Sequence, residues 1–152
     1  MISDGGIKFS GDIAKALAAG ADAVMVGSML AGTSEAPGKI IKKKGKLFKV
    51  FRGMGSVGAM NKGSADRYFQ KKQKDKSKYV PEGVEGLIKY KGDVSKTINK
   101  LVGGLKSSMG YLGAEQIKHL NKKAKFVKIT KAGFYESMVH SIDEVKKNSE
   151  YL

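Results

Sequence analysis

The chain has 152 residues, of which 41% are hydrophobic, and it contains no cysteine, which excludes disulfides, thiolate metal sites and a thiol nucleophile of its own. Its 29 Lys and Arg residues outnumber the 14 Asp and Glu residues, and the resulting net charge of +15 attracts anions. With no run of about 20 apolar residues and no basic-then-apolar leader, the sequence favours a cytoplasmic protein without membrane contact.

Nearly all of the positive charge comes from lysine, which is clustered at residues 42–44, 71–78 and 118–128. Arginine and stacking aromatic residues are not interleaved with these lysines, so we expect a solvated surface and no dedicated nucleic-acid surface. His119 and His140 lie far apart in the sequence without a histidine four residues away, so no histidine metal site is expected.

Residues 1–32 have the pattern of a βαβ unit. The apolar run Ala23–Val26, bounded by Gly20 and Gly27, is typical of a parallel strand buried on both faces. Ser10 is placed to cap the intervening helix and Gly20 to end it. The apolar face of this helix is expected to contain Ile13, Ala16, Leu17 and Gly20. Since the chain starts inside a parallel strand, we expect it to be a fragment of a larger sheet.

Small polar residues follow both strands of this unit, with Asp4-Gly5-Gly6 after the first and Gly27-Ser28 after the second. The carboxyl ends of parallel strands are where α/β folds place their sites. Glycine backbone amides can approach a phosphate closely, and the Asp4 carboxylate can accept hydrogen bonds from two ribose hydroxyls. The alternative is that these glycines only make tight turns.

A β-hairpin is predicted next, because Lys39–Ile41 and Lys46–Phe51 flank a turn at Lys44-Gly45. The second strand leads into the glycine-rich turn Arg52–Ser56. A third group of backbone amides could therefore point at the same anion. Together, residues 39–56 are interpreted as a hairpin and phosphate loop.

The rest of the chain alternates between polar and periodic segments. Residues 61–81 are polar and rich in lysine, which indicates a mobile flap or a disordered loop. The predicted regular elements after it are a strand at Leu87–Tyr90, a long helix from Asp93 to about Gly110, a short helix at 111–120 and a strand at Phe126–Ile129. Gly103-Gly104 should allow the long helix to pack closely, and the tail, 130–152, has no firm periodicity.

Seven motifs in this order closely resemble the carboxyl-terminal part of the inosine 5′-monophosphate (IMP) dehydrogenase family: SDGGI, AVMVGSMLAGTSEAPG, FRGMGSVGAM, SADRYFQ, VPEGVEG, GGLKSSMGYLGA and ITKAGFYES. The resemblance covers essentially all of 1–152. It implies an α/β fold in which residues 1–32 contain the last two strands of a (β/α)₈ TIM barrel. The chain would then supply about a quarter of that barrel and form an incomplete barrel. The earlier strands, any regulatory domain and the loop with the catalytic cysteine would then lie upstream.

The resemblance also implies an activity. The family oxidises IMP at its base with NAD through a covalent cysteine adduct, and then hydrolyses the adduct to xanthosine monophosphate. A chain without the cysteine loop is expected to be inactive alone and to act with the upstream part of the barrel. The relatives are usually homotetramers, so the complete enzyme is expected to be one.

The substrate-binding residues are transferred from the family by motif. Asp4 would bind the ribose hydroxyls, and the phosphate would be held by Gly5, Gly6, Gly27 and Ser28, completed by Phe51, Arg52, Gly53, Met54 and Gly55. The family usually has tyrosine where this chain has Phe51, and the missing phenolic hydrogen bond would cost about 1 kcal/mol. Glu82 matches the residue that contacts the purine ring.

Arg67 and Tyr68 match the flap pair in which arginine acts as the base that activates water. Arginine holds its proton above pH 12 in water, so this role requires a closed, dry site that flap closure after NADH departure could provide. Without the surrounding motifs, a solvated Arg-Tyr pair in a basic loop would be the alternative.

Two further sites come from the resemblance. Glu136, Ser137 and Met138 match a tail segment that gives carbonyl oxygens to a potassium ion (K⁺) shared with a neighbouring subunit, and hard oxygen donors suit an alkali ion. Gly110 and Tyr111 resemble residues that approach the NAD adenine across the subunit boundary, although a packing role for Tyr111 is the alternative.

Two other functions remain open at this point. A stand-alone basic anion- or RNA-binding protein could have reused the end of the fold, which salt-sensitive RNA binding without IMP binding would reveal. A guanosine monophosphate (GMP) reductase would share the barrel and the phosphate cradle, but its flap lacks the pair that Arg67 and Tyr68 form here.

Overall fold

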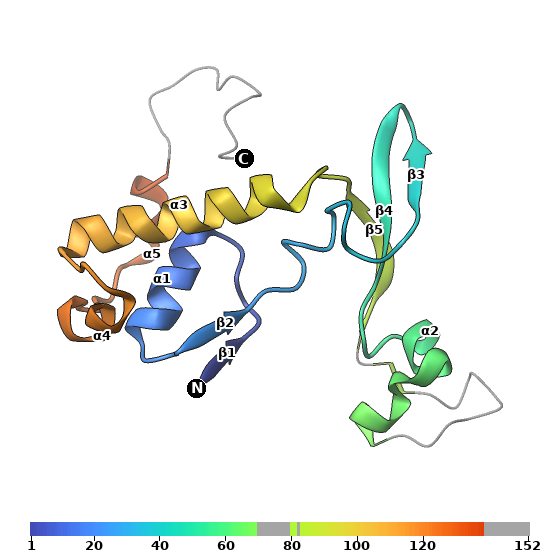
Figure 1. Ribbon diagram of the computed structural model, residues 1–152, viewed down its shortest axis with the longest axis horizontal. Helices are drawn as coiled ribbons and strands as arrows, with labels where there is room; N and C mark the ends of the chain where they lie inside the picture. Colours follow the sequence, from blue (N-terminus) through green and yellow to red (C-terminus); the bar gives the residue numbers. More distant parts are fainter. Residues whose placement is uncertain (70–79, 82, 139–152) are drawn as a thin grey trace.

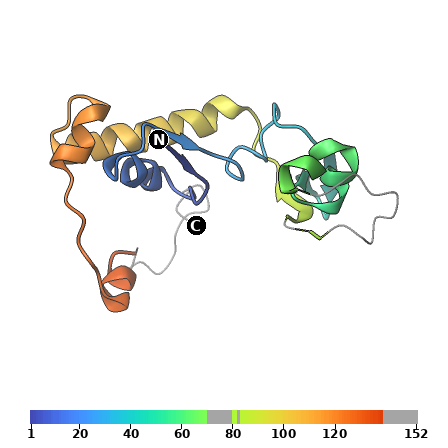
Figure 2. The same cartoon turned by 90° about the horizontal axis from the view of Figure 1, so that it is seen from below.

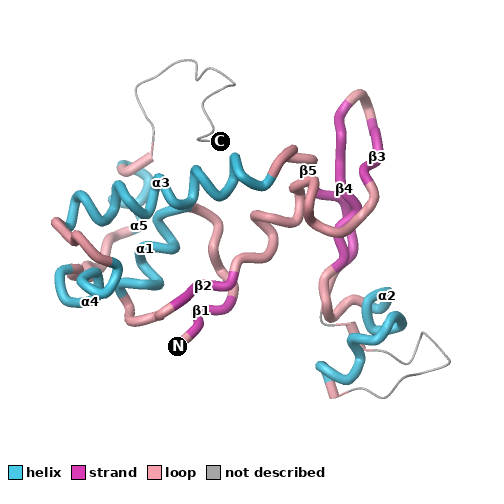
Figure 3. The backbone as a smooth tube through the Cα atoms, in the orientation of Figure 1, coloured by secondary structure: helices cyan, strands magenta, loops and turns pink. Residues whose placement is uncertain are grey.

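The computed structural model describes residues 1–69, 80–81 and 83–138. The chain has two parts (Figure 1). The helical part contains a βαβ unit packed under a long helix, and the hairpin part contains a three-stranded sheet with short helices inserted between its last two strands. A loop from residue 26 to 39 joins them and is drawn in pink in Figure 3. No helix within the described ranges is long and apolar enough to cross a membrane.

The predicted βαβ unit is confirmed. β1 (Ile2–Asp4) and β2 (Ala23–Met25) pair in parallel, with Ile2 opposite Ala23 and Asp4 opposite Met25. The prediction that the second strand is buried on both faces is wrong, because Met25 is 51% exposed and Ala23 is also exposed. A two-stranded sheet in the described chain has too few neighbours to cover both faces.

Helix α1 (Ser10–Ala18) begins one residue earlier than Ser10 capping would allow. Phe9 is the N-cap, and the carboxylate of Asp12 accepts hydrogen bonds from the backbone N–H groups of Lys8 at 3.0 Å and Phe9 at 2.9 Å. Ser10 was therefore wrongly predicted as the cap. The predicted stop at Gly20 is confirmed, because Gly20 adopts φ +105° two residues after the helix ends.

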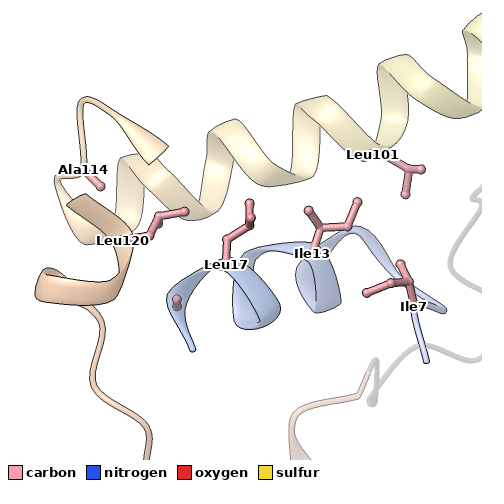
Figure 4. Close-up of a cluster of buried hydrophobic side chains, with 7 residues drawn as sticks. Ile7, Ile13, Leu17, Leu101, Ala114 and Leu120 are labelled. Atoms are coloured by element: carbon pink, nitrogen blue, oxygen red, sulfur yellow. The ribbon is translucent and has the colours of Figure 1, made fainter. Parts of the chain in front are cut away.

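The hydrophobic core lies between α1, α3 (Val94–Leu112) and α4 (Leu120–Lys123) (Figure 4). The predicted face of α1 is confirmed for Ile13 and Leu17, which are buried together with Ala14 and Ala18, while Ala16 and Gly20 are half-buried. The other buried members of the core are Ile7, Leu101, Ala114 and Leu120.

Helix α3 begins and ends with identifiable caps. The carboxylate of Asp93 accepts a hydrogen bond from the backbone N–H of Ser95 at 2.7 Å, and Gly113 ends the helix with φ +62°. The predicted end near Gly110 was too early, and the predicted short helix at 111–120 was wrong. Tyr111 and Leu112 belong to the last turn of α3, and a 3₁₀ turn (Ile117–His119) leads into α4.

The predicted hairpin is confirmed. β3 (Ile40–Lys43) and β4 (Lys46–Arg52) are antiparallel, and Lys44 and Gly45 both have positive φ, 50° and 76°, as a type I′ turn requires. β5 (Glu85–Lys89), which overlaps the predicted strand, pairs with the other edge of β4 and gives the order β3-β4-β5.

The segment after β4 is folded where a mobile flap was predicted. α2 (Val57–Ala59) continues into a kinked turn (Met60–Ser64) and a 3₁₀ turn (Ala65–Tyr68), which surround a small cluster made by the buried side chains of Met60 and Ala65. The alternative of a disordered loop is therefore wrong for residues 61–69, while their movement as a flap stays a prediction. Residues 70–79 of the predicted flap lie outside the described residues.

The segment Phe126–Ile129 was predicted as a strand and is not one. It has no regular secondary structure and pairs with no strand in the described residues, and Phe126 and Val127 are 64% and 80% exposed. Beyond it, Thr130 caps the short helix α5 (Lys131–Glu136) by accepting a hydrogen bond from the N–H of Gly133 at 3.0 Å. The predicted tail from residue 139 onward lies outside the described residues.

Candidate functional site

The two glycine turns of the helical part lie at one edge of the sheet. Because Asp4 pairs with Met25 in the parallel register, the turn after β1 and the turn Gly27-Ser28 follow neighbouring strands at the same end. Gly5 and Gly6 have φ of +80° and +76°, which side chains rarely adopt. A Cβ atom built on Gly5, Gly6 or Gly27 would meet no atom within 4 Å. The backbone at this edge is therefore open to an approaching anion.

The third turn, Arg52–Gly55, belongs to the hairpin part. In Figures 1 and 2 the turn lies at the end of β4 beside α2, apart from the ends of β1 and β2. Its hydrogen bonds run to the chain before β5, from the N–H of Gly53 to the carbonyl of Val84 at 2.9 Å and from the N–H of Gly83 to the carbonyl of Gly55 at 3.0 Å. Its convergence with the other two turns stays a prediction.

The individual residues of the third turn differ in exposure. Phe51 and Gly53 are half-buried, Gly55 is buried, and Arg52 and Met54 are exposed. A guanidinium nitrogen of Arg52 lies 3.5 Å from the carbonyl oxygen of Gly58. Glu82, predicted to contact the purine, lies outside the described residues.

The predicted water-activating pair lies on the 3₁₀ turn after α2. Tyr68 packs against the cluster of Met60 and Ala65, whereas Arg67 is exposed. The carboxylate of Asp66 accepts a hydrogen bond from the backbone N–H of Arg67 at 3.0 Å. The tyrosine is therefore anchored and leaves the neighbouring guanidinium accessible.

Gly110 and Tyr111 lie in the last turn of α3, where Tyr111 is 92% exposed. The alternative of a packing tyrosine therefore does not hold within the described chain. The predicted contact of these two residues with the NAD adenine stays a prediction.

Glu136, Ser137 and Met138 lie at the carboxyl end of α5 and are exposed. The last carbonyl groups of a helix have no intrahelical donors and carry partial negative charge. The donor chemistry of these three carbonyl groups therefore fits a hard alkali cation. In the described ranges, His, Cys, Asp and Glu side chains form no group of three or more that could hold a metal ion.

Sequence reasoning missed the contacts made by the loop of residues 26–39, which joins the two parts. The carboxylate of Glu35 accepts hydrogen bonds from the backbone N–H of Val94 at 3.0 and 3.1 Å, and these bonds lower the pKa of Glu35. Lys49 of β4 is buried, and its ammonium group donates to carbonyl groups of the same loop. The one signal for Lys49 was a lysine in the middle of the largely apolar strand 47–51.

Comparisons with known proteins identify relatives of this chain. A family model described as "IMP dehydrogenase / GMP reductase domain" matches residues 1–140. The chain is 56% identical to the inosine-5′-monophosphate dehydrogenase of Bacillus subtilis (strain 168) over 151 residues, which are 99% of this chain and 30% of that protein. The same enzyme from Rhizobium tropici is 56% identical over 93% of this chain and 28% of its own length. The Cryptosporidium parvum enzyme is 54% identical over 99% of this chain and 38% of its own length.

The chain thus spans about 30% of the length of the curated relatives that it matches. The family model covers most of the chain and includes both glycine turns at the sheet edge, the third turn and the Arg-Tyr pair. The chain belongs to the IMP dehydrogenase / GMP reductase family.

Proposed function

We propose that this chain is the nucleotide-holding, carboxyl-terminal part of an IMP dehydrogenase, which oxidises IMP to xanthosine monophosphate with NAD. One observation carries the proposal: β1 and β2 end side by side in glycine turns whose backbone faces open space. The family to which the chain belongs and the printed names of its relatives supply the substrate class.

Each turn has a chemical task in this proposal. The exposed carboxylate of Asp4 accepts hydrogen bonds from the ribose hydroxyls, and the backbone N–H groups of Gly5, Gly6, Gly27 and Ser28 donate to the 5′-phosphate. The turn Arg52–Gly55 and Glu82 approach from the hairpin part to complete the phosphate and purine contacts. The net charge of +15 favours the encounter with an anionic nucleotide.

The hydrolytic half of the reaction is assigned to Arg67 and Tyr68. The guanidinium of Arg67 is exposed, and it reaches the attacking water beside the nucleotide only after the segment closes over the site. Tyr68 fixes the conformation of that segment by packing on the cluster of Met60 and Ala65. In a dry site, the loss of solvation favours the neutral arginine, which then accepts the proton of the attacking water. Because this chain has no cysteine, the nucleophile comes from another part of the protein.

NAD and K⁺ are assigned by the same reasoning. NAD supplies the hydride acceptor when bound, and the exposed ring of Tyr111 beside Gly110 offers a stacking surface for its adenine. The carbonyl groups of residues 136–138 are the proposed K⁺ ligands. Both sites face a neighbouring subunit in this proposal, which is consistent with a homotetramer in the cytoplasm.

Isothermal titration of the protein with IMP tests the substrate site. Asp4→Ala removes two charge-assisted hydrogen bonds and should weaken IMP binding by about tenfold or more. Asp22→Ala is the matched control, because Asp22 is an exposed carboxylate that precedes β2 at the opposite edge of the same sheet, and it should leave the affinity unchanged. Tight, salt-sensitive RNA binding without IMP binding would instead support the basic nucleic-acid-binding alternative.

Steady-state and rapid-mixing kinetics of the full-length protein test the flap pair. Arg67→Lys keeps the charge but loses the proposed base, so turnover should fall by about 10²–10⁴-fold while the first burst of NADH persists. Lys62→Ala, an exposed cation in the same segment, should retain turnover. Equal loss of the burst and of turnover would contradict a hydrolytic role, and reduction of GMP would assign the chain to the reductase branch of the family.

A further inference from the structure

Lys49 lies in the middle of β4 and is 2% exposed, whereas the apolar residues Leu47 and Val50 of the same strand are 47% and 41% exposed. This is the reverse of the usual pattern, since lysine is almost never fully buried unless it is paired. The buried position therefore requires a specific set of acceptors.

The acceptors are three backbone carbonyl groups of one loop. The ammonium nitrogen of Lys49 donates hydrogen bonds to the carbonyl of Thr33 at 2.5 Å, to that of Ser34 at 2.8 Å and to that of Ala36. A lysine ammonium group has three donors, so all of them are used. Among the described residues, no carboxylate pairs with this ammonium group. The loop is therefore wrapped around a single cation.

The same loop lies directly against the backbone of the hairpin part. The N–H of Ser34 donates to the carbonyl of Gly92 at 2.8 Å, and the N–H of Val50 donates to the carbonyl of Lys39 at 3.0 Å. Gly38 has φ +117°, and a Cβ atom there would collide with the carbonyl of Val50. Such close approach leaves the loop little freedom to move relative to β4.

The loop is continuous with the Gly27-Ser28 turn. The hydroxyl of Thr33 donates to the carbonyl of Leu30 at 2.8 Å, and the ammonium group of Lys91 donates to the carbonyl of Met29 at 3.0 Å. β4 in turn leads directly into Arg52–Gly55. Lys49 thus connects the backbone that follows one proposed phosphate-binding turn to β4, the strand that precedes another.

We infer that Lys49 is a positioning residue, which sets the placement of the Gly27-Ser28 turn relative to the Arg52–Gly55 turn by holding the 33–36 loop on β4. This inference rests on the proposed IMP site. Lys49 touches no substrate in this role, and its effect should appear as selectivity for the phosphate group of the nucleotide. An apolar side chain of similar length would leave the three carbonyl groups without donors, and the loop would have to open to solvate them.

The test compares IMP with inosine, which lacks the phosphate, in titrations of the full-length protein. Lys49→Met should weaken IMP binding by about tenfold or more, as expected when binding groups move by about 1 Å, and should leave inosine binding unchanged. Lys46→Met on the same strand, where the side chain is exposed, is the matched control and should retain the wild-type preference for IMP over inosine. In turnover, KM for IMP should rise in Lys49→Met while KM for NAD stays constant.

A parallel loss of IMP and inosine affinity, or an unchanged preference for IMP with lower thermal stability, would overturn the inference and leave Lys49 a structural residue. If Lys49→Met fails to fold, Lys49→Gln, which keeps two donors, should show a smaller loss of the preference for IMP over inosine. A wild-type preference in Lys49→Gln would equally overturn the inference.

Hydrogen exchange separates this inference from the proposed function. The amides of Ser34 and Val50 should exchange faster in both variants even if the wild-type protein binds no IMP, and unchanged exchange would refute the clamp itself.

Discussion

The helical part buries side chains between helices, whereas the hairpin part is built mainly from backbone hydrogen bonds between strands. Ile13 and Leu17 of α1 and Leu120 of α4 belong to one core beneath α3. The buried hydrophobic residues described in the hairpin part are Met60 and Ala65, and its other buried side chains include Lys49 and Ser56. The difference indicates that apolar burial stabilises the first part, while sheet register and polar contacts fix the geometry of the second.

This difference can be tested by removing one buried side chain from each part. Leu120→Ala and Met60→Ala both truncate a side chain with no exposed surface, so their local burial is matched. Leu120→Ala should reduce the free energy of unfolding of the helical part by about 2–5 kcal/mol, because a cavity forms where three helices meet. Met60→Ala should release only residues 57–69. Circular dichroism during urea denaturation and hydrogen exchange of α1 and α3 would measure both effects.

If Met60→Ala lowered the urea midpoint of α1 and α3 as much as Leu120→Ala does, the two parts would form a single cooperative unit. Neither part would then be stabilised independently of the other. A local loss of protection at 57–69, with α1 unchanged, would support two independently stabilised parts.

Local patterns predicted the parts of the fold that depend on near neighbours in the sequence. The Lys44-Gly45 turn was predictable because positive φ at two central residues matches the twist of the flanking strands. The cap of α1 was mispredicted because Phe9 is the N-cap, and the Asp12 carboxylate binds the backbone N–H groups of Lys8 and Phe9 just before the helix. Phe126–Ile129 has strand composition, but a strand needs a partner that composition cannot specify.

The candidate site also contains some features that local sequence predicts and others that depend on tertiary contacts. Two glycine turns after adjacent parallel strands predicted one open edge of the sheet, because parallel pairing alone brings Asp4 close to the end of β2. The burial of Lys49 depends on how residues 33–36 fold back on β4, and no spacing in the sequence reports that contact. Glycine geometry is local and therefore predictable, whereas a buried cation surrounded by carbonyl groups is a tertiary property.

Two adjacent glycines on α3 differ in how closely they approach α1. A Cβ atom at Gly104 would collide with the side chain of Ser10 on α1, whereas one at Gly103 would meet nothing within 4 Å. Gly103→Ala should stabilise the protein by about 0.5–1 kcal/mol through helix propensity alone. Gly104→Ala gains the same propensity but overpacks the contact, at a cost of about 1–3 kcal/mol, and should be a net destabilisation.

Urea denaturation of the two alanine variants measures this contrast, and Ser10→Gly is the partner change that removes the colliding atoms. In a protein that already carries Ser10→Gly, the further change Gly104→Ala should destabilise less than it does in the wild type, because the colliding atoms are gone. Equal stabilisation by alanine at both positions would mean that α1 does not pack closely on α3 in solution.

Acid should act on the helical part through the carboxylates at its helix starts. Burial raises the pKa of Asp12, but hydrogen bonds from the backbone N–H groups of Lys8 and Phe9, together with Lys15, outweigh it and lower the pKa overall. The pKa of Asp93 is lowered by hydrogen bonds from the hydroxyl and then the backbone N–H of Ser95. Both carboxyl groups therefore bind these donors more strongly when they are ionised.

The sign of the pH dependence follows from these lowered pKa values. A carboxylate with a folded pKa below its unfolded value of about 4 stabilises the folded state at higher pH, and this contribution is lost as the pH falls through the folded pKa. Unfolding free energies measured from pH 6 down to pH 3 should therefore decrease below about pH 4. Asp12→Asn should be less stable at pH 6 by about 0.5–1 kcal/mol and should lose less on acidification, since it has no proton to bind. A decrease of the same size in Asp12→Asn and in the wild type would assign the acid sensitivity to other carboxylates, because the α1 cap would then hold equally well in either charge state.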